Sequence, residues 1–155
     1  MITAVDTNII LDILVPDAIH GDTSEKALVD ASGSGAVVVS GAVYAELAAH
    51  FPDRDGLDTF LNETGMRLEP SGAETFYAAG MAWRDYVARR PVSMVCAACG
   101  HPQNVVCEEC SAVLHPRQHV VADFMIGAHA FLQADGLLTR DRGFYHTYFP
   151  DLRLI

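Results

Sequence analysis

The sequence predicts an α/β fold with a mostly parallel β-sheet that is covered by helices on both faces. Short apolar runs rich in β-branched residues, such as Ile2–Val5 and Ala36–Ser40, alternate with longer segments whose apolar residues recur at helical spacing. Such alternation is typical of parallel strands joined by right-handed crossovers. The chain has 155 residues, 50% of them hydrophobic, which is enough for one core and too few for two full domains. We expect a single domain over residues 1–155, with an insertion at 91–118.

The first half of the chain is expected to alternate between strands and helices. Ile2–Val5 is too short for a helix and is predicted to be a buried strand, followed by a helix over Thr7–Leu14. A polar start and the Gly33–Gly35 stop predict a helix over Asp22–Ala31 before the strand Ala36–Ser40. The elements expected next are helices over Ala42–His50 and Leu57–Glu63, a strand over Met66–Leu68 and a longer helix over Ala73–Arg89.

After the insertion, helical spacing resumes over Val120–Leu132. We then expect a strand over Leu137–Thr139, a short helix over Gly143–Tyr148 and a terminal strand over Leu152–Ile155. No apolar run approaches the roughly 20 residues that span a bilayer. The start of the chain lacks the basic region and cleavage site of a signal peptide, so we expect a cytoplasmic protein.

The charge of the chain constrains its partners. Twenty acidic residues against ten Lys and Arg give a formal net charge of −10. This excess opposes nonspecific binding to a polyanion, because affinity for nucleic acid comes largely from neutralising phosphates. If the substrate is a nucleic acid, bound metal ions or a local Arg cluster must hold its phosphates.

Four acidic residues lie near the predicted strand ends. Asp6 directly follows the first strand, Glu46 lies in the helix after the second, and Asp141 follows the fourth. Asp123 lies in the first turn of the helix that leads into the fourth strand, where the helix dipole favours an anion. Because parallel strands end at one edge of a sheet, we expect the four carboxylates to meet there.

Four adjacent carboxylates repel one another and raise each other's pKa unless a cation neutralises them. All-oxygen ligation suits Mg²⁺ or Mn²⁺, and such a site can activate water for in-line attack on phosphorus. Taken singly, the acids also have ordinary interpretations: a helix start for Asp123, a turn for Asp141 and a solvated helix face for Glu46. Arg140 and Arg142, which flank Asp141, are expected to pair with acids at the surface, with contact to a phosphate as the alternative.

Other carboxylate chemistries find less support. A phosphoaspartate phosphatase would need a second Asp two residues after Asp6, where the chain has Asn8. A response-regulator receiver would need a lysine after a late strand, and Lys26 is the single lysine. The chain has no Gly-x-x-x-x-Gly-Lys phosphate loop.

Four blocks of the sequence closely resemble the acidic blocks of PIN-domain ribonucleases, most of all the VapC-type toxins of toxin–antitoxin pairs. Each block alone is a weak signal, but their order and spacing together are specific. The resemblance covers Met1 to about Arg90 and Val120–Ile155. The blocks are Val5–Leu11, Tyr44–Leu47, Ala122–Ala130 and Leu137–Tyr145.

This resemblance implies a three-layer PIN-like fold with about five parallel strands, Mg²⁺- or Mn²⁺-dependent cleavage of RNA, homodimers and control by a small antitoxin. It assigns two sets of residues by position. The implied metal ligands are Asp6, Glu46, Asp123 and Asp141. The residues implied to support them by hydrogen bonding are Asn8 and Thr139.

The insertion contains two CxxC pairs separated by seven residues, a spacing typical of a tetrahedral zinc site. We expect zinc rather than disulfides, because a cytosolic chain disfavours disulfides. PIN toxins usually lack such an insertion. The predicted structural zinc ligands are Cys96, Cys99, Cys107 and Cys110.

One hypothesis is that zinc only stabilises an insertion too short for its own core. Alternatively, basic residues near it contact RNA or a partner: Arg84, Arg89, Arg90 and Arg117 with His115 and His119. Two functions compete with that of a toxin. One is an RNA-processing PIN nuclease without an antitoxin, and the other is a zinc-stabilised RNA- or protein-binding module whose acidic cluster is inert.

Overall fold

A computed structural model of the chain describes residues 1–15, 19–89, 94–95, 101–103, 105–114 and 120–155. Its centre is a four-stranded sheet in the order β3-β2-β1-β8. All three neighbouring pairs in this sheet are parallel, as the sequence predicts. The strands are β1 (Ile2–Val5), β2 (Ala36–Val39), β3 (Met66–Leu68) and β8 (Gly136–Leu138).

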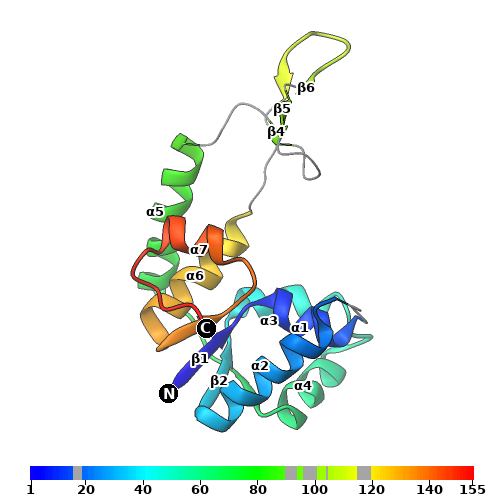
Figure 1. Ribbon diagram of the computed structural model, residues 1–155, viewed down its shortest axis with the longest axis vertical. Helices are drawn as coiled ribbons and strands as arrows, with labels where there is room; N and C mark the ends of the chain where they lie inside the picture. Colours follow the sequence, from blue (N-terminus) through cyan, green and yellow to red (C-terminus); the bar gives the residue numbers. More distant parts are fainter. Residues whose placement is uncertain (16–18, 90–93, 96–100, 104, 115–119) are drawn as a thin grey trace.

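Helices cover both faces of this sheet, which gives three layers. Figure 1 shows α5, α6 and α7 gathered on one side of β1 and β2, with α1, α2 and α4 on the other. None of the helices in the described ranges combines the length and the apolar character needed to cross a membrane. The helices are α1 (Thr7–Leu14), α2 (Gly21–Ser34), α3 (Gly41–Ala48), α4 (Arg54–Glu63), α5 (Ala73–Arg89), α6 (Val121–Gln133) and α7 (Arg142–Tyr148).

The prediction of a terminal strand over Leu152–Ile155 is wrong. Residues 152–155 contribute a single parallel bridge, between Leu137 and Leu154. The reason is local, because the N–H of Leu152 still donates to the carbonyl of Phe149 in the turn after α7. Pairing with β8 is limited to this one bridge, so the sheet is not extended by a further strand.

The end of α2 also differs from the prediction. The helix runs through Gly33 to Ser34, and Gly35, with φ of +151°, ends it. A Cβ atom at Gly35 would lie 2.1 Å from the carbonyl oxygen of Met1. The stop is therefore fixed by the approach of the chain's first residue, whose carbonyl also accepts a hydrogen bond from Ala36.

The predicted insertion contributes two small antiparallel pairs, β4 (Met94–Val95) with β5 (Pro102–Gln103) and β6 (Val105–Val106) with β7 (Val113–Leu114). Figure 1 shows β4, β5 and β6 away from the central sheet, beyond the end of α5. Of the predicted zinc ligands, Cys96 and Cys99 lie outside the described residues.

Close packing of α6 against the chain after α7 requires a glycine. A Cβ atom at Gly127 would lie 2.3 Å from Cε2 of the Phe149 ring, well inside van der Waals contact. Gly80, in α5, has no such neighbour within 4 Å. An added methyl group would therefore clash with the Phe149 ring at Gly127 but would meet open space at Gly80.

Gly127→Ala is expected to lower the free energy of unfolding by about 1–3 kcal/mol, because the methyl group overpacks the core. Gly80→Ala is the matched control, expected to raise it by up to about 1 kcal/mol through better helix propensity. Urea denaturation of the two variants measures both changes. Equal stability of the two variants would contradict the packing described for α6.

Candidate active site

The Asp6 carboxylate is held at the carboxyl end of β1 by three donors. Asp6 precedes α1 but makes no side-chain capping bond to it. Its Oδ2 instead accepts hydrogen bonds from Nδ2 of Asn8 at 2.8 Å, Oγ1 of Thr139 at 2.6 Å and the hydroxyl of Tyr145 at 3.2 Å. The Oδ1 atom receives none of these three bonds.

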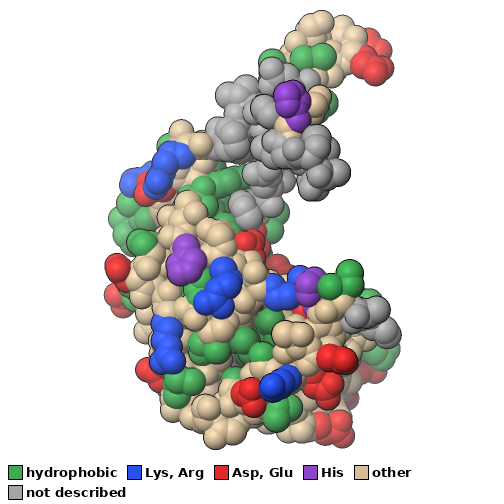
Figure 2. Space-filling view, viewed as in Figure 1, with side chains coloured by type: hydrophobic (Ala, Val, Ile, Leu, Met, Phe, Trp, Pro, Cys, Tyr) green, Lys and Arg blue, Asp and Glu red, His purple; other side chains and the backbone are tan. Residues whose placement is uncertain are grey.

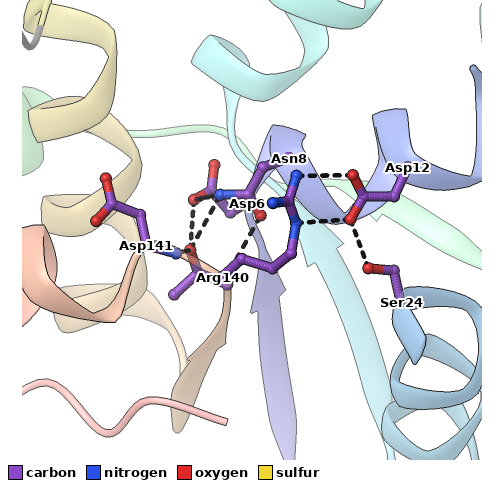
Figure 3. A network of polar contacts seen from close by, with 7 residues as sticks. Asp6, Asn8, Asp12, Ser24, Arg140 and Asp141 are labelled. Atoms are coloured by element: carbon purple, nitrogen blue, oxygen red, sulfur yellow. Dashed lines mark hydrogen bonds and ion pairs between the residues drawn. The ribbon is translucent and has the colours of Figure 1, made fainter. Parts of the chain in front are cut away.

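Thr139 connects the two strand ends at this site. Its hydroxyl oxygen accepts from Nδ2 of Asn8 at 3.3 Å and from the backbone N–H of Asp141 at 3.0 Å, while the hydroxyl donates to Asp6. Figure 3 shows these contacts between the start of α1 and the segment after β8. Asn8 and Thr139 therefore lie where supporting residues were expected, in direct contact with Asp6.

Negative charge accumulates around Asp6. The residue is 6% exposed, and burial is the main reason why its pKa is raised above the usual value. Hydrogen bonds from Thr139 and Tyr145 lower the pKa, whereas the negative charges of Asp123 and Glu46 raise it. These two acids thus lie near enough to Asp6 to act on it, and a cation at this point would relieve the repulsion.

Glu46 reaches the same region from α3. Its side chain is half-buried, and one carboxylate oxygen accepts a hydrogen bond from the hydroxyl of Thr7, the residue next to Asp6. Sequence patterns gave no role to Thr7. The bond fixes α3 against the start of α1 and brings the second acid beside the first.

Asp123 and Asp141 each bind the start of their own helix. Asp123, half-buried, accepts from the backbone N–H of Val120 at 2.9 Å, and Asp141, exposed, accepts from that of Phe144 at 3.1 Å. The negative charges of both raise the pKa of Tyr145, so both lie near its hydroxyl. The structure thus brings all four predicted acids to one edge of the sheet.

Tyr145 is a site residue that sequence reasoning missed. It is buried, and burial raises the pKa of its phenol far above the usual value, with a further contribution from the charge of Asp6. The hydroxyl therefore stays protonated and serves as a donor to Asp6. An aromatic residue in a short helix looks like core packing, and the one sequence signal was its position one turn after Asp141.

The two arginines beside Asp141 differ from expectation. Arg140 forms an ion pair, but its partner Asp12 is buried, 5% exposed, rather than at the surface. Asp12 also accepts a bond of 2.6 Å from the hydroxyl of Ser24, as Figure 3 shows. Arg142 donates instead to the carbonyl oxygens of the last two residues of the chain.

The donor set suits a hard divalent ion, although the acids are not preassembled around one. Within the described ranges, no group of three or more His, Cys, Asp and Glu side chains is arranged so that it could hold a metal ion. Asp123 and Asp141 are turned toward their own helix starts. Their oxygens and the surplus negative charge at Asp6 nevertheless match the chemistry of Mg²⁺ or Mn²⁺.

Two of the four predicted zinc ligands are described. Cys107 and Cys110 are free thiols in one turn, closed by a hydrogen bond from the N–H of Ser111 to the carbonyl of Cys107 at 2.9 Å. Hydrogen bonding from the backbone of Cys110, and next from that of Glu109, lowers the pKa of the Cys107 thiol. A lowered pKa favours the thiolate, which is the form that binds metals.

The basic side chains of the described residues are scattered over the face seen in Figure 2. Figure 2 shows Lys and Arg side chains as small separate groups on the visible face. Of the arginines expected to gather near the insertion, Arg84 and Arg89 both pair with Asp85 on α5. Arg90 and Arg117 lie outside the described residues.

Asp6→Asn is expected to raise the midpoint of thermal unfolding at pH 7 in EDTA, because the amide has no charge to bury. The pKa of Asp6 is higher in the folded chain than its ordinary value of 3.8. Protonation therefore stabilises the fold as pH falls, and this contribution is lost as pH rises through the folded-state pKa. The difference between the unfolding midpoints of the variant and the wild type should shrink as the pH falls from about 7 toward 4. A wild type with the higher midpoint at pH 7 would contradict this account.

Solved structures with the same fold share little sequence with this chain. VapBC2 from Rickettsia felis, bound to a DNA fragment from their promoter, has 17% identity and a TM-score of 0.60 over 100% of this chain and 98% of that chain. VapBC-1 from nontypeable Haemophilus influenzae has 16% identity and a TM-score of 0.64 over 100% and 97%. Mycobacterium tuberculosis VapC20, a Sarcin-Ricin loop cleaving toxin, has 16% identity and a TM-score of 0.52 over 97% and 98%.

Among curated proteins, no sequence matches this chain significantly. The likeness to the three solved structures is a likeness of fold. The sequence itself matches the PIN domain over residues 3–150. Since this match spans nearly the whole chain and includes all four acids, the protein belongs to the PIN domain family.

Proposed function

We propose that this protein is a metal-dependent endoribonuclease that cleaves RNA phosphodiesters, and that it is the toxin of a type II toxin–antitoxin pair. The observation that carries the proposal is a buried carboxylate, Asp6, placed among other carboxylates at the strand ends of a PIN-domain sheet. Among the similar structures, one is a toxin that cleaves the Sarcin-Ricin loop, and two are VapBC complexes.

The four acids are proposed to hold Mg²⁺ or Mn²⁺, with Asp6 at the centre because its charge is the least solvated. Such an ion, when bound, polarises a phosphoryl oxygen and activates water for attack on phosphorus. Asp123 and Asp141 would then contribute oxygens that do not cap their helices. No side chain is needed as a covalent nucleophile.

Three hydrogen-bond donors hold the Asp6 carboxylate in one orientation for ion binding. Asn8, Thr139 and Tyr145 all donate to its Oδ2 atom, and Oδ1 takes part in none of these three bonds. Because Tyr145 keeps its proton, it continues to donate at neutral pH. Carboxylates would repel an RNA phosphate without a cation, so binding of substrate and ion is coupled.

The net charge of −10 also favours a particular class of inhibitor. An antitoxin segment with Arg or Lys side chains would complement the acidic edge of the sheet electrostatically. A second copy of the chain remains an expected partner on the strength of the PIN resemblance. Zinc, bound by the four cysteines, is proposed to stabilise the insertion.

The wild type is expected to cleave single-stranded RNA in Mg²⁺ or Mn²⁺ and to lose this activity in EDTA. Asp6→Asn should lower the cleavage rate at least about 100-fold, equal to roughly 2.7 kcal/mol, by removing the central ligand charge. Asp53→Asn is the control, because it makes the same change at the N-cap of α4, where Asn caps as well as Asp. Cleavage that persists in EDTA would refute the metal-dependent mechanism.

Expression of the wild type in a bacterial host should arrest growth, and a small protein encoded beside it should relieve the arrest. The Asp6→Asn variant should not be toxic. An active nuclease that causes no arrest would point to RNA processing without an antitoxin. A chain that binds RNA without cleaving it would point to a binding module.

The purified chain should contain one zinc ion, measured by elemental analysis. Cys107→Ser with Cys110→Ser should remove the zinc and make the insertion more susceptible to proteolysis, because two thiolates cannot replace four. Glu108→Gln, in the same turn, should keep the metal. Full zinc content in the double Cys variant would rule out the proposed ligands.

A further inference from the structure

Asp12 is a buried acid that does not belong to the proposed ion site. Both of its oxygens are bound by the Arg140 guanidinium: Nε lies 2.7 Å from Oδ2, and Nη2 lies 2.7 Å from Oδ1. The hydroxyl of Ser24 adds a bond to Oδ2. A planar guanidinium that binds both carboxylate oxygens fixes distance and orientation together.

This ion pair joins parts of the chain that are far apart in sequence. Asp12 lies on α1 and Ser24 on α2, whereas Arg140 lies 128 positions after Asp12, in the segment 139–141 between β8 and α7. The same segment carries Thr139 and Asp141. Figure 3 shows the Arg140 side chain reaching from this segment across to Asp12.

The segment 139–141 determines how Asp6 is held. The backbone N–H of Arg140 donates to Oδ1 of Asn8 at 3.3 Å, which leaves the amide nitrogen of Asn8 facing Asp6. The preceding residue, Thr139, donates to Asp6 directly. Two of the three donors to Asp6 therefore depend on the position of this segment.

Stability alone does not account for the pair. Burying the Asp12 carboxylate costs solvation although the Arg140 side chain is 39% exposed, and well-packed apolar residues in place of such a pair commonly give equal or greater stability. What an apolar contact lacks is the fixed geometry of the paired guanidinium and carboxylate. The pair is therefore suited to holding the segment 139–141 in one position.

We propose that the Asp12–Arg140 ion pair is a positioning device that holds the segment 139–141 against α1, so that Asp6 and Asp141 are aligned to bind the divalent ion. The inference rests on the proposed function. Asp12 and Arg140 act through Asn8 and Thr139 and touch neither ion nor RNA.

Two variants separate positioning from stability. Asp12→Leu combined with Arg140→Met replaces both charges by apolar groups and leaves no unpaired charge in the interior. Arg140→Lys keeps the charge but loses the two-point contact. Arg54→Met is the control, since Arg54 forms an ion pair with Asp58 through Nε at 3.1 Å, but its side chain is 82% exposed on α4.

The primary measurement is Mn²⁺ binding by titration calorimetry without RNA, at a temperature well below the unfolding midpoint of each variant. The double variant should keep a midpoint close to that of the wild type and bind Mn²⁺ about tenfold more weakly, equal to about 1.4 kcal/mol. Arg140→Lys should weaken binding less, and Arg54→Met should not change it. High Mn²⁺ should restore RNA cleavage in the double variant.

Wild-type affinity for Mn²⁺ in both Arg140 variants would overturn the positioning role and leave the proposed nuclease intact. If the double variant fails to fold, Arg140→Lys decides the question by the same measurement. A wild type that binds Mn²⁺ and cleaves no RNA would refute the proposed function but not the positioning role. A wild type that binds no Mn²⁺ would refute both.

Discussion

Three hydrogen bonds to one oxygen of Asp6 are the constraint on which the rest of this site depends. One donor, Asn8, lies at the start of α1, whereas the other two come from the residue after β8 and from α7, so these two bonds form only when β1 and β8 lie side by side. The parallel pairing of these two strands thus brings Thr139 and Tyr145 within hydrogen-bonding distance of the Asp6 carboxylate. The fold supplies both the burial that makes Asp6 costly to ionise and the donors that hold it in place.

The other acids around Asp6 each accept a hydrogen bond from a group of their own. Asp123 and Asp141 bind the N–H groups at the starts of α6 and α7, where helix dipoles favour an anion. Glu46 is held by Thr7. These contacts distribute the charge around Asp6 and give each acid a partner that an arriving cation can partly replace.

Local patterns predicted most of the fold because they act within one element. The bounds of β1 and α5 follow from their own residues, and Asp6 could be placed because strand ends meet at one edge of a parallel sheet. The roles of Asn8 and Thr139 came instead from the resemblance to PIN-domain ribonucleases. What the patterns missed depends on contacts across the chain. The end of α2 is set by Met1, the partner of Arg140 is buried on another helix, and Tyr145 looks like any core aromatic until its hydroxyl is placed beside Asp6.

The separation of Thr139 from Asp6 by 133 positions has a consequence for the folding of the chain during its synthesis. Domains form during synthesis from the amino end, and the ribosome adds residues over many seconds. A nascent chain from which Thr139 has not yet emerged can hold Asp6 with one of its three donors, Asn8. The contacts that hold the Asp6 carboxylate are thus completed only after both Thr139 and Tyr145 have been synthesised.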